Sequence, residues 1–293
     1  MDHNLYLEKN RALWNHWASL HPHSAFYNNA SFIEDPQSLH SIERNVLPNL
    51  KGKSVLHLQC HFGQDTISLA NLGATHVVGL DFSPEAIRQA EKLNTACSTQ
   101  VTFVESDVLQ ILPHLENTFD VVFASYGVVG WHPSAKAWMD AAFSYLKPGG
   151  SLVLVDFHPV LWILDEEFKE IKYPYFNTGV IIEDRAGSYA APEANQMVNY
   201  TWNHSISDLI LPIVDHPERS LTFYGARTML PLLIAAICKK LPEYPMINAR
   251  YDDEAGVVTR HGSVHLGMAT QFCNGLMITV IYNPHVHDPR QLS

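Results

Sequence analysis

Short runs of consecutive apolar residues alternate with segments of helical periodicity through the first half of the chain. The apolar runs predict buried strands, because a strand covered on both faces needs apolar residues at successive positions. We expect five such strands, at 54–58, 76–80, 101–104, 119–124 and 151–157. Helices are expected at 5–20, 65–72, 84–94 and 135–146. This alternation predicts an α/β fold with a doubly wound, mostly parallel, Rossmann-like sheet.

The regular alternation stops after the fifth strand, which follows a predicted tight turn at Lys147–Gly150. Residues 160–204 are rich in aromatic residues and interrupted by Pro and Gly, so we expect an insertion that serves as a substrate lid. Further elements are expected as helices at 205–214 and 229–241 and strands at 220–224 and 276–282. We therefore divide the chain into a domain at 1–224 and an atypical C-terminal segment at 225–293.

Charge and cysteine usage restrict the partners and the compartment. The formal net charge of −11 disfavours nucleic acid, whose phosphates attract basic proteins. The chain has no C-x-x-C pair, which predicts reduced thiols and neither disulfides nor a metal site; its cysteines are Cys60, Cys97, Cys238 and Cys273. The N-terminus lacks a basic leader, and the longest apolar run, 230–238, is too short to span a bilayer. We expect a cytoplasmic protein without a membrane partner.

Ligands of such sheets bind at the carboxyl ends of the strands, so the loops at 57–65, 81–84, 105–108, 124–132 and 156–160 are the candidate site. Three of these loops carry a pattern: VLHLQCHFG at 55–63, VGLDFS at 78–83 and SDV at 106–108. Together the three segments resemble the class I S-adenosylmethionine-dependent methyltransferases, over about residues 40–160. The family's first loop is usually rich in glycine; here Gln59 and His61 replace two glycines, and Gly63 remains.

The resemblance implies S-adenosylmethionine as the cofactor. Asp81 would accept hydrogen bonds from the ribose hydroxyls and Asp107 from the adenine amino group, while Asp65 is either a partner of the ammonium group or an ordinary helix-start carboxylate. Ser83 is the better N-cap of the helix at 84–94, which leaves Asp81 for the cofactor. The predicted cofactor-binding residues are Gln59, Cys60, His61, Gly63, Asp65, Asp81, Phe82, Ser83, Ser106, Asp107, Val108, Ser125 and Tyr126.

The methyl acceptor is expected to be a small molecule. His158, which follows the fifth strand, is the candidate proton acceptor, although a lone histidine is more often structural. The candidate acceptor-binding residues are Trp131, His132, Trp202 and His204. Simple core packing is the alternative for the aromatic residues among them. No metal is predicted.

The C-terminal part has a second resemblance. Residues 229–293, with LPEYPMINARYDDE at 241–254 and HLGMATQ at 265–271, are similar to part of the dihydrolipoamide acyltransferase core. The His-x-x-x-Asp-Gly motif of that family does not occur in this region, so acyl transfer is not expected. This segment either completes the sheet or forms a small appended unit, and an open sheet edge favours the former.

Two other functions remain open from the sequence. A nicotinamide-dependent oxidoreductase would share the strand-turn-helix unit and the acidic residue after the second strand, but Gln59, His61 and Asp107 count against it. A noncatalytic cofactor- or partner-binding protein, derived from a methyltransferase, would explain the altered loop and the acyltransferase-like segment. Cofactor binding discriminates between these functions.

Overall fold

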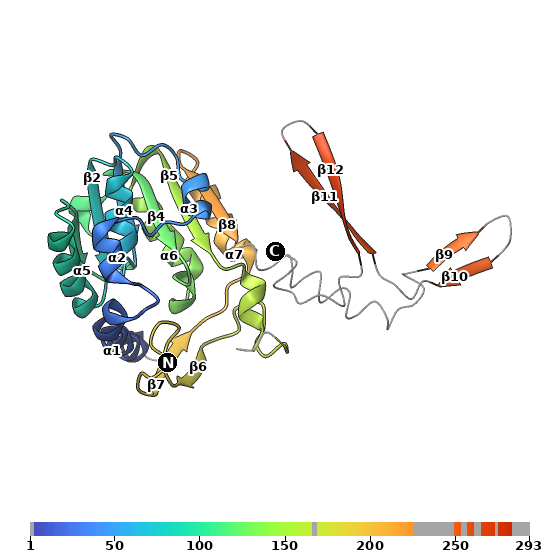
Figure 1. Ribbon diagram of the computed structural model, residues 1–293, viewed down its shortest axis with the longest axis horizontal. Coiled ribbons are helices and arrows are strands. Elements are labelled where there is room, and N and C mark those ends of the chain that lie inside the picture. Colours follow the sequence, from blue (N-terminus) through green and yellow to red (C-terminus); the bar gives the residue numbers. More distant parts are fainter. Residues whose placement is uncertain are drawn as a thin grey trace. The chain divides into compact units, whose positions relative to one another are not determined.

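The buried strands form one parallel sheet of six strands, in the order β3-β2-β1-β4-β5-β8 (Figure 1). The computed structural model describes residues 3–165, 169–225, 249–252, 257–260, 265–272 and 275–282. The strands of the sheet are β1 (Ser54–Leu58), β2 (His76–Asp81), β3 (Thr102–Glu105), β4 (Phe119–Ser125), β5 (Leu146–Asp156) and β8 (Ser220–Gly225). The predicted doubly wound sheet is therefore confirmed, and β8 adds a sixth parallel strand to it.

Helices connect the strands and cover the sheet. The α-helices are α1 (His3–Leu20), α2 (Asn29–Glu34), α3 (Ser41–Val46), α4 (Gln64–Asn71), α5 (Pro84–Ala96), α6 (Ala135–Ser144) and α7 (Ile206–Ile210). Short 3-10 helices are η1 (His21–His23), η2 (Pro113–Leu115), η3 (Val129–Trp131), η4 (Pro159–Ile163) and η5 (Leu211–Asp215). The helix predicted at 205–214 is thus a short α-helix followed by 3-10 helix, with Pro212 at the start of η5.

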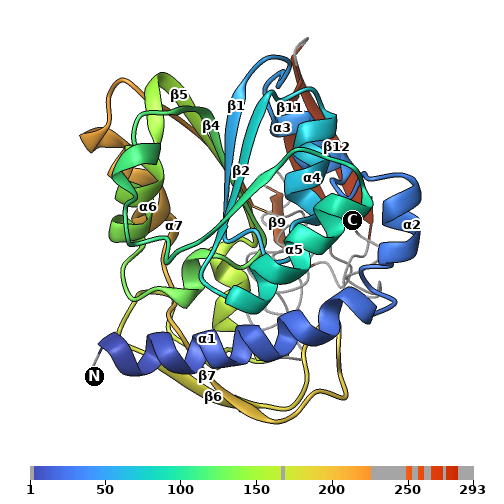
Figure 2. The same ribbon diagram turned by 90° about the vertical axis from the view of Figure 1, so that its left-hand side faces the viewer.

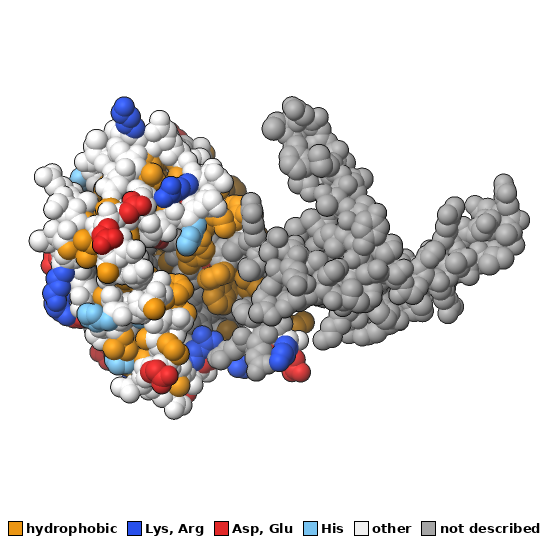
Figure 3. Space-filling model, in the orientation of Figure 1, with side chains coloured by type: hydrophobic (Ala, Val, Ile, Leu, Met, Phe, Trp, Pro, Cys, Tyr) orange, Lys and Arg blue, Asp and Glu red, His pale blue; other side chains and the backbone are white. Residues whose placement is uncertain are grey.

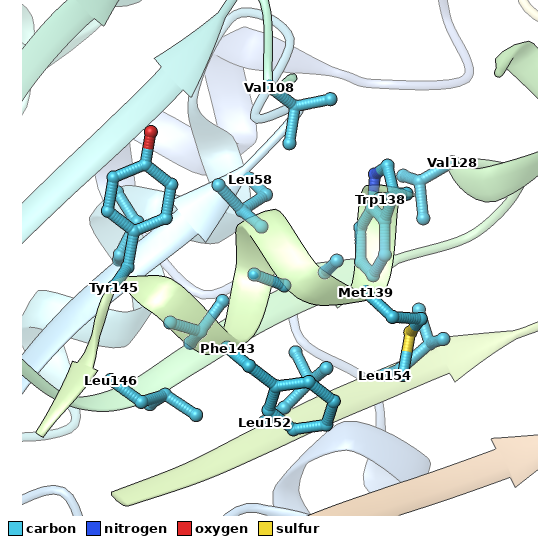
Figure 4. Close-up of a cluster of buried hydrophobic side chains, with 14 of the residues drawn as sticks. Leu58, Val108, Val128, Trp138, Met139, Phe143, Tyr145, Leu146, Leu152 and Leu154 are labelled. Carbon is cyan, nitrogen blue, oxygen red and sulfur yellow. The ribbon is translucent and has the colours of Figure 1, made fainter. Parts of the chain in front are cut away.

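Alternate residues of each strand enter two separate cores, one on each face of the sheet. Leu56 and Leu58 pack on one face and Val55 on the other, and β2, β4 and β5 alternate in the same way. Figure 4 shows the first core, where Trp138, Met139 and Phe143 of α6 meet Leu152 and Leu154 of β5. The second core lies under α4 and α5. Burial on both faces explains why the strands are apolar throughout.

The segment Lys147–Gly150 belongs to β5 rather than to a separate turn. Leu146 pairs with Phe119, and the next pair is Ser151 with Val121, so the residues between them bulge out of the ladder. Gly149 adopts a φ of +79° within the bulge. The expected turn is therefore an irregular beginning of the fifth strand.

The insertion after β5 carries an antiparallel hairpin, β6 (Ile181–Arg185) and β7 (Met197–Thr201). Figure 2 shows α1 running across one edge of the sheet with this hairpin beside it. The buried amide of Asn10 joins the two, since its Nδ2 donates to the carbonyl of Tyr200 at 2.8 Å and its Oδ1 accepts the Tyr200 N–H at 3.0 Å. Helix α1 and the insertion thus form one layer along that edge.

The chain divides into two compact units after Gly225. The described part of the second unit consists of two hairpins, β9 (Ala249–Asp252) with β10 (Val257–Arg260) and β11 (His265–Phe272) with β12 (Gly275–Tyr282). The strand predicted at 276–282 is present and pairs with β11. The helix predicted at 229–241 lies outside the described residues. Within the described ranges, no helix is long and apolar enough to cross a membrane.

Candidate functional site

The strand order reverses between β1 and β4, and the crevice at the carboxyl ends of these two strands is where parallel sheets bind ligands. The loop at residues 59–63 follows β1 and leads into α4. The loop at 126–131 follows β4 and includes η3. These two loops border the candidate site.

The loop after β1 keeps a glycine-like path without its glycines. Gln59, His61 and Gly63 all have positive φ, at 53°, 50° and 86°. For the two side-chain-bearing residues this left-handed conformation costs about 1–2 kcal/mol each. Gly63 has a further reason to be glycine, because a Cβ there would lie 2.6 Å from the ring of Phe103. Gln59 and His61 therefore adopt a backbone conformation that glycine favours.

The Gln59 side chain forms hydrogen bonds that help to hold this strained loop. Its Nε2 donates to the carbonyl of Val128 at 3.0 Å, and its Oε1 accepts the indole N–H of Trp138 at 2.7 Å. These bonds join the loop after β1 to the loop after β4 and to α6. The amide thus supplies contacts that a glycine lacks.

Asp81, the last residue of β2, is tied to the same loop. Its Oδ2 accepts the backbone N–H of His61 at 2.9 Å, and its Oδ1 accepts that of Ser83 at 2.9 Å. Burial, which leaves Asp81 6% exposed, raises its pKa to about 6 even though these N–H donors favour the carboxylate. Ser83 caps α5 by accepting the N–H of Ala86 at 3.1 Å, as predicted. The Asp81 carboxylate is therefore fixed at the carboxyl edge by loop contacts.

The residues after β3 lie next to Asp81. The Ser106 N–H donates to the carbonyl of Asp81 at 2.9 Å, and half-buried Asp107 accepts the Leu109 N–H at Oδ1, also at 2.9 Å. Val108 is buried in the core of Figure 4. On the β2 side, the guanidinium of Arg11 lies 5.9 Å from the ring of Phe82. The two predicted carboxylates thus follow neighbouring strands.

Asp65 has partners within the chain. Its Oδ1 accepts the hydroxyl of Ser38 at 2.5 Å, and its Oδ2 accepts that of Ser125 at 3.2 Å. Burial raises its pKa, against the effect of these donors. Cys60 is buried, and burial also raises the pKa of its thiol. The Cys60 side chain therefore faces the interior.

Asp156 organises the loop after β4, a role that the sequence analysis missed. It is buried at the end of β5 and accepts the N–H groups of Gly127 and Phe157, both at 2.6 Å. Burial raises its pKa to about 6. Tyr126, at a φ of 51°, donates its hydroxyl to Glu43. A carboxylate at the end of a fifth strand is the same signal that identified Asp81.

Seven side chains form what we call the aromatic cluster, which lies against the His61 loop; its members are Trp14, Trp17, His21, Tyr27, His61, Trp131 and Tyr189. The ring centroid of Trp14 lies 5.1 Å from that of Trp17, 5.4 Å from that of His61 and 5.3 Å from that of Trp131. Trp14 therefore bridges the loops after β1 and β4. Four members come from α1, η1 and the segment that follows it.

Hydrogen bonds join the aromatic cluster to the insertion. Nδ1 of His21 lies 2.9 Å from Nε2 of His61, and Nε2 of His21 lies 2.8 Å from the Ser188 hydroxyl oxygen. The hydroxyl groups of Tyr27 and Tyr189 are 2.5 Å apart. Burial lowers the pKa of His21 to about 4 and that of His61 well below its usual value. Both imidazoles are therefore neutral at pH 7.

The predicted acceptor-binding residues fall into two groups. Trp131 belongs to the aromatic cluster. Trp202 packs against Tyr6, with ring centroids 4.8 Å apart, and Nε2 of His204 lies 2.9 Å from the carbonyl oxygen of His132. His132, Trp202 and His204 are all buried. Trp131 is thus the predicted acceptor-binding residue that the structure places beside the His61 loop.

His158 caps η4. Its Nδ1 accepts the N–H of Val160 at 3.3 Å, which assigns the imidazole proton to Nε2. Partial burial lowers its pKa. Nδ1 can accept a proton from the methyl acceptor only if its hydrogen bond from Val160 breaks. The predicted catalytic role of His158 therefore requires this cap to open. Residues 3–165 and 169–225 contain no group of three His, Cys, Asp or Glu side chains that could hold a metal ion.

Known proteins resemble the part of the chain that contains these loops. Residues 55–150 match the family described as "Methyltransferase domain". The chain is 39% identical over 132 residues to an uncharacterized methyltransferase of Synechocystis, an alignment that covers 43% of this chain and 58% of the relative. A solved S-adenosylmethionine dependent methyltransferase from Mesorhizobium loti is 18% identical with a TM-score of 0.46, over 59% of this chain and 77% of that one.

A second match follows the methyltransferase domain. Residues 209–293 match the catalytic domain of 2-oxoacid dehydrogenase acyltransferases. Over 64 residues the chain is 52% identical to the lipoamide acyltransferase component of the branched-chain alpha-keto acid dehydrogenase complex of Pseudomonas aeruginosa, which covers 22% of this chain and 15% of that relative. Both resemblances found in the sequence are therefore confirmed, each over part of the chain.

Proposed function

We propose that the protein transfers a methyl group from S-adenosylmethionine to an O, N or C atom of a small molecule. The observation that carries this proposal is the loop at 59–63, which keeps a glycine-like path through Gln59 and His61 and is bonded to Asp81 at the end of β2. The methyltransferase domain at 55–150 includes both the loop and Asp81. A strained backbone at a strand end is typical of a ligand site.

The carboxylates at the carboxyl ends of β2 and β3 fit this cofactor. Asp81 would hold the ribose hydroxyls and Asp107 the adenine amino group, because carboxylates accept hydrogen bonds from both kinds of donor. Phe82 and the loop at 106–108 would flank the adenine. When bound, the cofactor supplies a methyl group on a positively charged sulfur. The chain's own contribution is to align the acceptor and exclude water, which α1 and the insertion do by covering this edge.

Charge and composition support a small acceptor in the cytoplasm. The chain carries a net charge of −11, and Lys and Arg side chains are scattered over the described surface visible in Figure 3. Such a surface offers little to the phosphates of a nucleic acid. We propose no nucleic-acid or membrane partner. His158 stays the predicted proton acceptor, subject to release of its bond from Val160.

Calorimetric titration of the full chain tests the function. We expect micromolar binding of S-adenosylmethionine and S-adenosylhomocysteine and no binding of NADH. Asp81→Asn removes the charge beside the ribose and should weaken binding about tenfold or more. The matched control is Asp120→Asn, because Asp120 lies near the start of β4, at the opposite edge, bonded to Ser54 and Lys147.

Each other outcome favours one of the alternatives. Failure of the wild-type chain to bind either sulfur compound would leave a noncatalytic partner-binding protein. Binding of NADH instead would favour an oxidoreductase. Equal weakening by the Asp81 and Asp120 variants would mean that Asp81 has no special role.

A further inference from the structure

Two ring nitrogen atoms of the aromatic cluster have no hydrogen-bond partner among the described residues. Nε1 of Trp17 and Nδ1 of His61 are buried and have no hydrogen-bond partner among residues 3–165 and 169–225. Trp17 itself is 5% exposed. An indole N–H can only donate, and buried donors are nearly always paired with protein or another molecule. The cluster therefore contains a buried donor, Nε1 of Trp17, that has no partner among these residues.

The contacts of Ser188 determine which nitrogen of His61 carries the proton. The Ser188 hydroxyl oxygen accepts the N–H groups of Ala191, at 2.9 Å, and Ala190, at 3.3 Å, which occupies both of its lone pairs. Its own O–H is left to donate to Nε2 of His21. Nδ1 of His21 then holds the His21 proton and donates to Nε2 of His61. The proton of neutral His61 therefore lies on Nδ1, as a second unpaired donor.

The two donors share neighbours in the cluster. The ring of Trp14 contacts both Trp17 and His61, with centroids 5.1 Å and 5.4 Å apart. His21 also contacts both, at 6.0 Å from Trp17 and 5.0 Å from His61. Faces and edges of several rings therefore surround the donors, which suits a planar aromatic ligand.

The charges around the two donors restrict the kind of ligand that could accept their hydrogen bonds. The donors are uncharged N–H groups, so the atom that they bind is a hydrogen-bond acceptor and not a cation. An anion would approach Asp81, whose carboxylate already binds the backbone N–H of His61, and Asp65 also lies close enough to act on Tyr27 and Tyr189. The group that fits is an uncharged oxygen, such as a carbonyl or a phenol.

The position of Trp17 indicates the methyl acceptor rather than the cofactor. Trp17 lies outside residues 55–150, the range that matches the methyltransferase family, and so do His21 and Ser188, which set the tautomer of His61; His61 itself lies within that range. The residues that would hold the cofactor lie within it. Segments outside a shared domain are where a specific acceptor is recognised.

We infer that the methyl acceptor is a planar aromatic molecule whose uncharged carbonyl or phenolic oxygen accepts hydrogen bonds from Nε1 of Trp17 and Nδ1 of His61. This inference rests on the proposed function and names its substrate class. Trp17 and His61 would position the acceptor, and Ser188 and His21 would hold His61 in the required tautomer. The strained backbone of His61 is then retained for its side chain.

Three probes of similar size test the substrate class on the full chain saturated with S-adenosylhomocysteine. Coumarin presents a neutral carbonyl, benzoate a carboxylate and phenyltrimethylammonium a cation. We expect coumarin to bind in calorimetric titration and the two charged probes to bind at least tenfold more weakly. Trp17→Phe, which keeps a ring and removes the N–H, should weaken coumarin about fivefold to tenfold. Trp162→Phe is the control, since Trp162 is 42% exposed and lies in the insertion.

Several results would overturn the inference. They are no binding of coumarin, tighter binding of either charged probe, or unchanged coumarin binding by Trp17→Phe. If Trp17→Phe weakened the binding of S-adenosylhomocysteine as much as that of coumarin, the donors would belong to the cofactor site. If the variant fails to fold, nitrogen-15 imidazole spectra of the wild-type chain still decide, because a proton on Nε2 of His61 would refute the assignment. If the wild-type chain does not bind S-adenosylhomocysteine, the proposed function is refuted instead.

Discussion

Gln59 and His61 occupy a backbone conformation that glycine adopts without strain, and each side chain has its own contacts. Gln59→Ala removes the bonds to Val128 and Trp138 and keeps the strain, whereas Gln59→Gly removes the same bonds and relieves it. We expect both variants to lower the free energy of unfolding by about 1–3 kcal/mol, with the glycine variant about 1 kcal/mol more stable than the alanine variant.

Urea unfolding followed by tryptophan fluorescence measures these differences. All 6 tryptophans lie between Trp14 and Trp202, so the signal reports the first unit alone. Equal stability of the two Gln59 variants would show that residue 59 carries no backbone strain.

His57 makes stability depend on pH. It is buried in β1 with Nδ1 2.8 Å from the Thr66 hydroxyl oxygen, and burial lowers its pKa to about 3. Between about pH 6.5 and 3 the unfolded chain binds a proton at this residue and the folded chain does not, so its contribution is complete above that range and is lost as the pH falls. His57→Gln removes this dependence. We expect the stability difference between wild type and variant to fall by about 2 kcal/mol from pH 7 to pH 5.

The control for this measurement is His23→Gln, because His23 is exposed. Its unfolding curves should follow the wild type at both pH values. If the His57 variant also kept a constant difference from the wild type, His57 would be protonated to the same extent in both states.

Among the elements, α1 and β7 depend on each other through the two hydrogen bonds between Asn10 and Tyr200. Asn10→Ala leaves the N–H and the carbonyl of half-buried Tyr200 in β7 without their partner, which costs about 1–3 kcal/mol locally. We expect hydrogen–deuterium exchange of the amides at 197–201 to accelerate at least tenfold, with no change in β1 and β4. Ser19→Ala is the matched control on α1, since the exposed Ser19 bonds only within its own helix. Faster exchange throughout the large sheet would contradict a local role.

The whole molecule joins two different sequence families. The acyltransferase match begins at residue 209, inside α7, and therefore includes β8, the edge strand of the large sheet. The unit that contains the methyltransferase match thus takes its sixth strand from a segment that matches another family. The second unit begins only after that strand.

Removal of residues 226–293 tests whether the first unit is independent. Both core clusters lie between Tyr27 and Tyr224, so we expect the truncated chain to keep its tryptophan-monitored stability within about 0.5 kcal/mol and its S-adenosylhomocysteine affinity within about twofold. A large loss in either measurement would show that the second unit supports the first.

Much of the fold could be predicted because local patterns determine it. Apolar runs identify strands that are covered on both faces, and Ser83 with Pro84 determines where α5 begins. Asp81 and Asp107 could be found by their position after strands. The bulge at Lys147–Gly150 could not, because a Gly-Pro turn signal does not say whether pairing resumes on the same strand.

The sequence by itself determined the order of strands and helices along the chain and the position of Asp81 and Asp107 at the carboxyl edge of the sheet, next to β2 and β3. Tertiary structure alone decided how that edge is covered. His21 meets Ser188 across 167 residues, and Tyr27 meets Tyr189 across 162. No local pattern predicts such pairs, because they exist only once α1 and the insertion fold over the same strand ends. The tautomer of His61, and with it the inferred acceptor class, follows from those long-range contacts.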